Sequence, residues 1–153
     1  MGTNLHSYRL ESLNPDTVFE TRKYSNGRTE FIFNASQLSD PDLSENIRSC
    51  AKNGLHPKGC NSIAACADHD IAHLLFYKAG MEEDKEFVRH VEFFRRHPKY
   101  LLRFISRYPY RFLEDRQKFA QELLAECWAS ANNDRRAPKI HRFFANLLEK
   151  RLS

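Results

Sequence analysis

Residues 61–79 read NSIAACADHDIAHLLFYKA, a run that combines helical apolar periodicity with a cluster of polar residues. Stepped at about 100° per residue, the apolar positions cover most of the helix surface. A helix that is apolar nearly all round is normally buried among other helices. The segment therefore predicts a central helix, which Asn61 can cap and which ends before Gly80.

The chain on both sides of this segment also has helical periodicity. Helices are expected over residues 40–53, 82–97, 98–107, 109–131 and 138–152. Pro98 and Pro109 suit the first position of a helix, because a proline there loses no helical hydrogen bond. The sequence predicts a bundle of five to six helices over about residues 40–152.

Upstream of the helices, residues 18–33 predict a β-hairpin. Asn26-Gly27 lies between its two strands, and both residues tolerate the positive φ of a tight turn. Counting outward from this turn pairs Lys23 with Glu30. We therefore expect one mostly α-helical domain, residues 1–153, with its N-terminal hairpin lying on the helices.

The composition is that of a globular chain, with 41% hydrophobic and 29% charged residues. No window approaches the roughly 18 apolar residues of a membrane span, and the N-terminus lacks the apolar stretch of a signal peptide. These features predict a cytoplasmic protein with no membrane span. The four cysteines are then expected as thiols or metal ligands rather than disulfides.

The polar residues of segment 61–79 form a candidate zinc site. Cys66, His69 and His73 are spaced i, i+3 and i+7, so they share one helix face. Thiolate and imidazole are ligands that zinc prefers, and Cys50, His56 and Cys60 lie just upstream and could complete a tetrahedral set. The cysteine spacing resembles that of CCCH zinc fingers, which implies zinc as a cofactor.

Two alternatives use the same residues differently. His69 and His73 can be ordinary core histidines, with Asp70 one turn away as a hydrogen-bond partner for His73. Cys60 follows Gly59 near a predicted helix start, where the helix dipole would lower the pKa of a thiol. That arrangement is used by thiol hydrolases.

A third interpretation comes from a resemblance. Residues 65–70, ACADHD, preceded by Cys50 and followed by YKAG at 77–80, resemble the active-site helix of bacterial and fungal secreted phospholipases A2. The resemblance implies a hydrolase in which His69 activates a water molecule and Asp70 binds calcium. The partner aspartate of that family falls on His90 here. Another carboxylate, Glu86 or Glu92, would then have to orient His69.

The C-terminal half is basic and aromatic. Residues 1–87 contain nine Lys/Arg and thirteen Asp/Glu, whereas residues 88–153 contain fifteen and seven. The candidate contact residues are Arg95, Arg96, Lys99, Tyr100, Arg103, Arg107, Tyr108 and Arg111. Cations at helical spacing from Arg96 to Arg107 can neutralise phosphates, and the tyrosines can stack on bases. The outer face of any amphipathic helix gives a similar pattern.

From these patterns we expect a small non-enzymatic binding or regulatory protein. Its basic half would engage an anionic partner, either nucleic acid or an acidic protein surface, and zinc would be a structural cofactor. The alternative is a hydrolase centred on His69 and Asp70, metal-assisted or similar to phospholipase A2. The apolar stripe of residues 141–152 can pack within the chain or form a homodimer.

Overall fold

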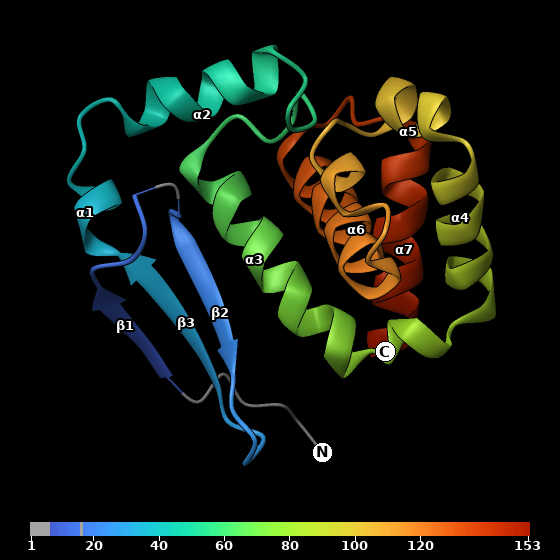
Figure 1. Cartoon of the computed structure of the whole chain (residues 1–153), viewed down its shortest axis with the longest axis horizontal. Coiled ribbons are helices and arrows are strands. Elements are labelled where there is room, and N and C mark those ends of the chain that lie inside the picture. The colour runs from blue at the N-terminus through green and yellow to red at the C-terminus, as the bar shows by residue number, and fades with distance from the viewer. Residues whose placement is uncertain (1–6, 16) are drawn as a thin grey trace.

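The computed structural model describes residues 7–15 and 17–153, which form a mostly helical fold with a small N-terminal sheet (Figure 1). The expected fold class is confirmed. The helices are α1 (Ala35–Leu38), α2 (Leu43–Lys52), α3 (Ile63–Lys78), α4 (Lys85–Arg96), α5 (Pro98–Phe104), α6 (Arg116–Asn133) and α7 (Lys139–Leu152), with 3-10 turns η1 (Met81–Glu83) and η2 (Pro109–Phe112). None of the helices in the described ranges combines the length and apolar character that a membrane crossing requires.

The sheet has three strands rather than the two of the predicted hairpin. β2 (Phe19–Lys23) and β3 (Thr29–Asn34) are antiparallel, and β1 (Ser7–Glu11) pairs with β3 in parallel, in the order β1-β3-β2. β1 is not predicted from the sequence, because its residues, SYRLE, are largely polar and lack the apolar alternation of a typical strand. In the structure its Leu10 is exposed. β2 packs against α3, so the hairpin lies on the helices as expected (Figure 1).

The register of the hairpin differs by one residue from the predicted one. Gly27 adopts a φ of +80° directly after a hydrogen-bonded turn that begins at Tyr24. A turn followed by a left-handed glycine lengthens the loop by one residue and introduces a bulge. Glu30 consequently pairs with Arg22, and the predicted pairing with Lys23 is wrong.

Three side chains cap the longer helices. Ser62 accepts a hydrogen bond from Ala65 N, which makes Ser62 rather than the predicted Asn61 the cap of α3. Asp84 caps α4 and Asp115 caps α6 in the same way. The predicted helix 109–131 is therefore divided: the first part is the short turn η2, and α6 begins only after its aspartate cap.

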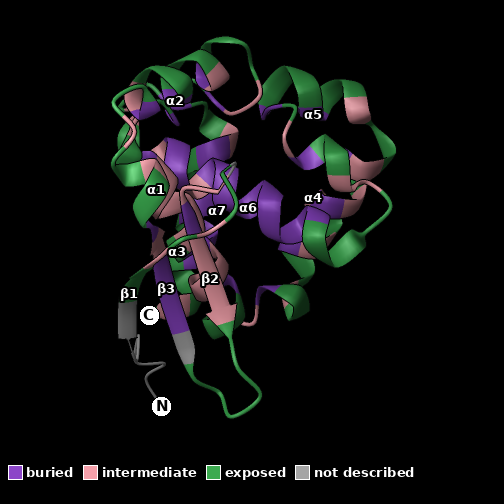
Figure 2. Ribbon diagram, turned by 60° about the vertical axis from the view of Figure 1, so that its left-hand side comes forward, coloured by how far each residue is buried: buried purple, intermediate pink, exposed green. Residues whose placement is uncertain are grey.

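The most deeply buried helix is α6 and not α3, contrary to the sequence-based expectation (Figure 2). Only Ala65, Ala72 and Phe76 of α3 are buried, and Ile63 and Ile71 are exposed. In contrast, α6 is buried on most of its surface, because α3, α4, α7 and η2 all pack against it.

Aromatic side chains from four helices meet in the core around α6. Phe76, Phe87, Phe119 and Phe144 are each fully buried. Burial of such rings is the main favourable term that holds the helices together. The apolar stripe of α7 belongs to this core, so it packs within the chain, one of the two outcomes that the sequence left open.

Replacement of Asp115 by alanine is expected to lower the free energy of unfolding by about 1 kcal/mol, because Lys118 N at the start of α6 loses its side-chain acceptor. Asp42→Ala is the matched control, since Asp42 precedes α2 without making a side-chain cap bond. Urea denaturation of both variants measures the difference. Equal losses in the two variants would contradict the capping role.

Candidate functional site

The contact between α3 and α6 brings two histidines opposite two buried glutamates. His69 and His73 are four residues apart on α3, and Glu122 and Glu126 are four residues apart on α6, so each pair lies on one face of its helix. Glu122 and Glu126 are 2% and 0% exposed. Carboxylates at this depth require charged or hydrogen-bonding partners.

Glu122 lies between the two histidine rings. Its Oε2 is 3.0 Å from His69 Nε2 and 3.5 Å from His73 Nε2. One ligand atom from each of the three residues lies within 4.8 Å of the others, which is close enough for a single metal ion. The second oxygen of Glu122 is 3.3 Å from the ammonium of Lys118.

Glu126 contacts two histidines, His69 on α3 and His56 in the loop before α3. Its Oε1 lies 3.1 Å from His69 Nδ1 and 2.8 Å from His56 Nδ1, while Ser106 Oγ donates to Oε2 at 2.7 Å. Three segments that are distant in sequence therefore converge on one carboxylate. His69 is held from both sides, because each ring nitrogen faces a different glutamate.

The loop that carries His56 approaches α6 very closely. Gly59 is buried, and a Cβ atom at this position would lie 2.8 Å from Asp134 Cβ and 3.0 Å from Ser130 O. Such distances are shorter than ordinary packing contacts. Only a glycine lets the loop lie this near the end of α6, which brings His56 within reach of Glu126.

The pKa values of these groups follow from burial and pairing. Burial disfavours the charged form of His69, but hydrogen bonds with Glu122 and Glu126 outweigh it and raise the pKa of His69 to about 10. Burial alone would raise the pKa of Glu126, but the bonds with His56 and His69 lower it to about 2. The pKa of Glu122 is lowered for the same reason by His69 and His73. Without a metal, the cluster is an imidazolium between two carboxylates.

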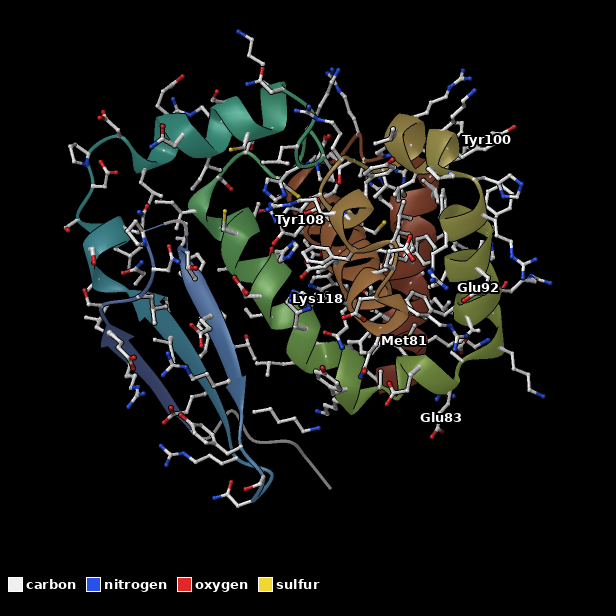
Figure 3. All side chains as sticks on the ribbon, in the orientation of Figure 1. Met81, Glu83, Glu92, Tyr100, Tyr108 and Lys118 are labelled. Carbon is white, nitrogen blue, oxygen red and sulfur yellow. The ribbon has the colours of Figure 1, made fainter. Side chains whose placement is uncertain are left out.

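Tyr108 and Lys118 border the cluster, and both are seen between α3 and α6 in Figure 3. The Tyr108 ring lies 4.8 Å from the His56 ring and 5.9 Å from the His69 ring, measured between centroids. The side chains of His69 and His73 remain 15% and 14% exposed. Nδ1 of His73 is buried and has no hydrogen-bond partner in the described part of the chain.

The predicted cysteine ligands do not join this group. Within the described residues, the metal-capable cluster contains His69 and His73 but not Cys50, Cys60 or Cys66. Burial raises the pKa of Cys66 to about 12, and it raises the pKa of the Cys60 thiol further. The expectation of a low-pKa thiol at Cys60 is therefore wrong, because burial outweighs any effect of the nearby helix start.

The carboxylates that contact His69 come from α6 and not from Glu86 or Glu92. Glu92 is instead bound to Arg95 and Arg116. Asp70, the calcium ligand implied by the resemblance to phospholipases A2, is half-buried, and burial raises its pKa to about 6.

Sequence reasoning missed Glu122 and Glu126. The signal that could have found them is their position inside FAQELLAECWA, residues 119–129, where two acids four residues apart lie in a mostly apolar segment. A carboxylate on the apolar face of a helix requires a partner. His69 and His73 on α3 have the same spacing of four residues as the two glutamates and were the candidate partners.

The predicted partner-binding residues separate into three groups. Tyr108 lies at the histidine cluster, with the Arg111 guanidinium 5.6 Å from its ring centroid. Arg95 and Arg107 donate to backbone carbonyls of Leu113 and Asn53. The others lie on or beside α5: Arg96, Lys99, Tyr100 and Arg103.

No model of a known protein family matches this chain, and searches of curated proteins and of solved structures return no match either. What the cluster does is therefore inferred from its own side chains.

In a chelating buffer, the combined contribution of His69 and Glu126 to the free energy of unfolding is expected to be highest between about pH 4.5 and 6.5. The raised pKa of His69 stabilises the fold fully below about 6.5, and this contribution is lost as the pH rises toward about 10. The lowered pKa of Glu126 stabilises the fold above about 4.5, and this contribution is lost as the pH falls toward about 2. Urea denaturation at successive pH values gives the profile.

His69→Gln isolates the histidine in this profile. It is expected to remove most of the decline between pH 6.5 and 8, which is at most about 1.4 kcal/mol per pH unit in the parent protein. His97→Gln, at an exposed position, is the control and should leave the decline in place. A decline that persists in the His69 variant would assign the effect to another group.

Proposed function

We propose that this protein binds one divalent transition-metal ion, with zinc as the best match, through His69, His73 and Glu122. The observation that carries the proposal is the position of Glu122 Oε2, 3.0 Å and 3.5 Å from the two ring nitrogens. Two ligand atoms bound about 2.0–2.1 Å from a tetrahedral ion are about 3.3 Å apart. The distances from Glu122 to the two histidines are thus close to the separation that one ion requires, and all three ligand atoms lie within 4.8 Å of one another.

Glu126 gives independent support for a metal site. A histidine that binds a metal through one nitrogen usually donates its other N–H to a carboxylate, which fixes the ring and raises its basicity. Glu126 stands in that position behind His69 and is itself held by Ser106 and His56. In the metal-bound form, the ion takes the place of the Nε2 proton of His69.

The donor set favours zinc over calcium or magnesium. Two imidazoles and one carboxylate are typical ligands of zinc, whereas calcium and magnesium prefer oxygen ligands alone. The thiols of Cys50, Cys60, Cys66 and Cys127 are free. Free thiols are consistent with the cytoplasmic location that we propose, where they remain reduced.

Hydrolysis is a second candidate function, favoured by the size of the ligand set. Three protein ligands leave one position of a tetrahedral zinc ion for water, whose pKa the ion lowers to about 7. The partial exposure of His69 and His73 favours access of water to this position. The Lys118 ammonium, 3.3 Å from Glu122, is placed to stabilise negative charge developing nearby.

Metal-free protein titrated with cobalt(II) is expected to bind one equivalent and to show the visible absorption bands of a tetrahedral nitrogen and oxygen site. Zinc should displace the cobalt and raise the free energy of unfolding, by about 2.7 kcal/mol at 100 times its dissociation constant. His73→Ala and Glu122→Gln each remove one ligand, so both should abolish the bands.

His97→Ala is the matched control for this titration, because His97 is exposed and lies outside the cluster. Circular dichroism establishes that each variant is folded. Unchanged cobalt bands in a folded Glu122→Gln variant would place the ion elsewhere, and no bands in the parent protein would leave the cluster as a purely structural ion pair.

The hydrolytic function predicts that zinc accelerates cleavage of an activated ester or an activated phosphodiester by the parent protein. Glu122→Gln should lose this acceleration, because the ion is no longer held. Lys118→Met should retain zinc binding but reduce the rate. Equal rates with and without zinc would exclude hydrolysis of these two substrate types and leave metal binding unaffected.

A further inference from the structure

Four aromatic rings lie next to one another at the corner between α4 and α5, and we call them the aromatic ladder: Phe93, His97, Tyr100 and Phe104. Phe93 stacks on His97 at 4.6 Å between centroids, and Tyr100 stacks on Phe104 at 6.0 Å with their planes 12° apart. Phe93 and Tyr100, 5.6 Å apart, join the two pairs. The rings form one continuous surface that extends from the end of α4 along α5.

The ladder is far more exposed than aromatic rings usually are. Phe93, Tyr100 and Phe104 are 43%, 47% and 41% exposed, and Tyr100 is labelled at the outer corner of α5 in Figure 3. The opposite side of α5 faces the core, where Leu101 is fully buried. A contiguous group of exposed rings is a common sign of a binding surface.

Cations surround the ladder. Arg96, Lys99 and Arg103 are exposed, and none of them forms an ion pair with an acid in the described residues 7–15 and 17–153. A surface hollow of about 200 Å³ is lined by Lys99, Tyr100 and Arg103. Residues 93–112 contain six Lys/Arg and no Asp or Glu, so the segment that carries the ladder has no acidic residue.

The surface differs from the basic stripe that the sequence predicted. α5 ends at Phe104, so Arg107 does not continue the helical row and instead donates to Asn53 O. Arg95 is likewise bound to Leu113 O. Among the predicted contact residues, the exposed cations that lie beside the aromatic ladder are therefore Arg96, Lys99 and Arg103.

We propose that the aromatic ladder with Arg96, Lys99 and Arg103 binds single-stranded nucleic acid, independently of the metal site. Unpaired bases present flat apolar faces that stack on exposed rings, and the cations lie beside the rings to neutralise the phosphates between those bases. A duplex keeps its bases stacked inside the helix and could use only the cations. An acidic protein would match the charge but not the rings.

The binding is measured by fluorescence anisotropy with a labelled 12-nucleotide oligothymidylate at low salt, in the presence of a chelator. The parent protein is expected to bind, and a plot of log affinity against log salt should have a slope of about −2 for three neutralised phosphates on a single strand. Arg103→Gln should reduce the magnitude of this slope by about 0.7. Tyr100→Leu and Phe104→Leu should each weaken binding roughly fivefold or more, because a stacked base is lost.

Two control variants separate this surface from general basicity. Tyr110→Leu changes a ring that is equally exposed but lies on η2 outside the ladder, and Arg142→Gln removes an exposed charge on α7. Both should bind nearly as the parent does.

Absence of binding at low salt, or equal loss in Tyr110→Leu and Tyr100→Leu, overturns the proposal. Preference for a duplex of the same length would also overturn it, and displacement by polyglutamate as effective as by unlabelled oligonucleotide would favour an acidic protein partner.

Discussion

The burial of two carboxylates inside α6 constrains the rest of this structure. A charged group removed from water costs several kcal/mol unless partners compensate it. Glu122 and Glu126 find those partners on α3, in the loop before it and in the segment after α5. Each of these segments is therefore held to the same helix by a polar contact as well as by apolar packing. Removal of the partners of Glu122 and Glu126 would leave uncompensated negative charge in the core, and removal of the two glutamates would leave His69 without its acceptors.

The same geometry suits a proton or a metal ion. In the metal-free protein, an imidazolium at His69 offsets part of the charge of the two glutamates, and the Lys118 ammonium lies 3.3 Å from Glu122; a divalent ion bound at Nε2 would carry two positive charges to the same place.

Local sequence patterns predict the helices and their order well, because apolar periodicity and prolines act within a few residues. They also predict that His69 and His73 share one face of α3. The glutamates could not be predicted in this way. They lie about fifty residues further along the chain, and local periodicity does not reveal which helices pack against each other. The one-residue change in hairpin register has a similarly specific cause, since the conformation of Gly27 decides the length of the loop.

The basic half illustrates how tertiary structure divides a continuous sequence pattern. Tyr100 and Tyr108 appear equivalent in the sequence, yet one points outward from α5 and the other covers the histidine cluster. The cause is the end of α5 at Phe104, after which the chain turns inward and Ser106 becomes buried. Residues only a few positions apart thereby belong to different sites.

The close approach at Gly59 has a consequence for the histidine cluster. A Cβ atom there would lie 2.8 Å from Asp134 Cβ, so the loop or the end of α6 would have to shift, and we expect the loop to move away from α6. His56, three residues earlier, would be withdrawn from Glu126 with it. The spacing of the cluster is thus determined in part by a residue that touches none of its atoms and has no functional group of its own.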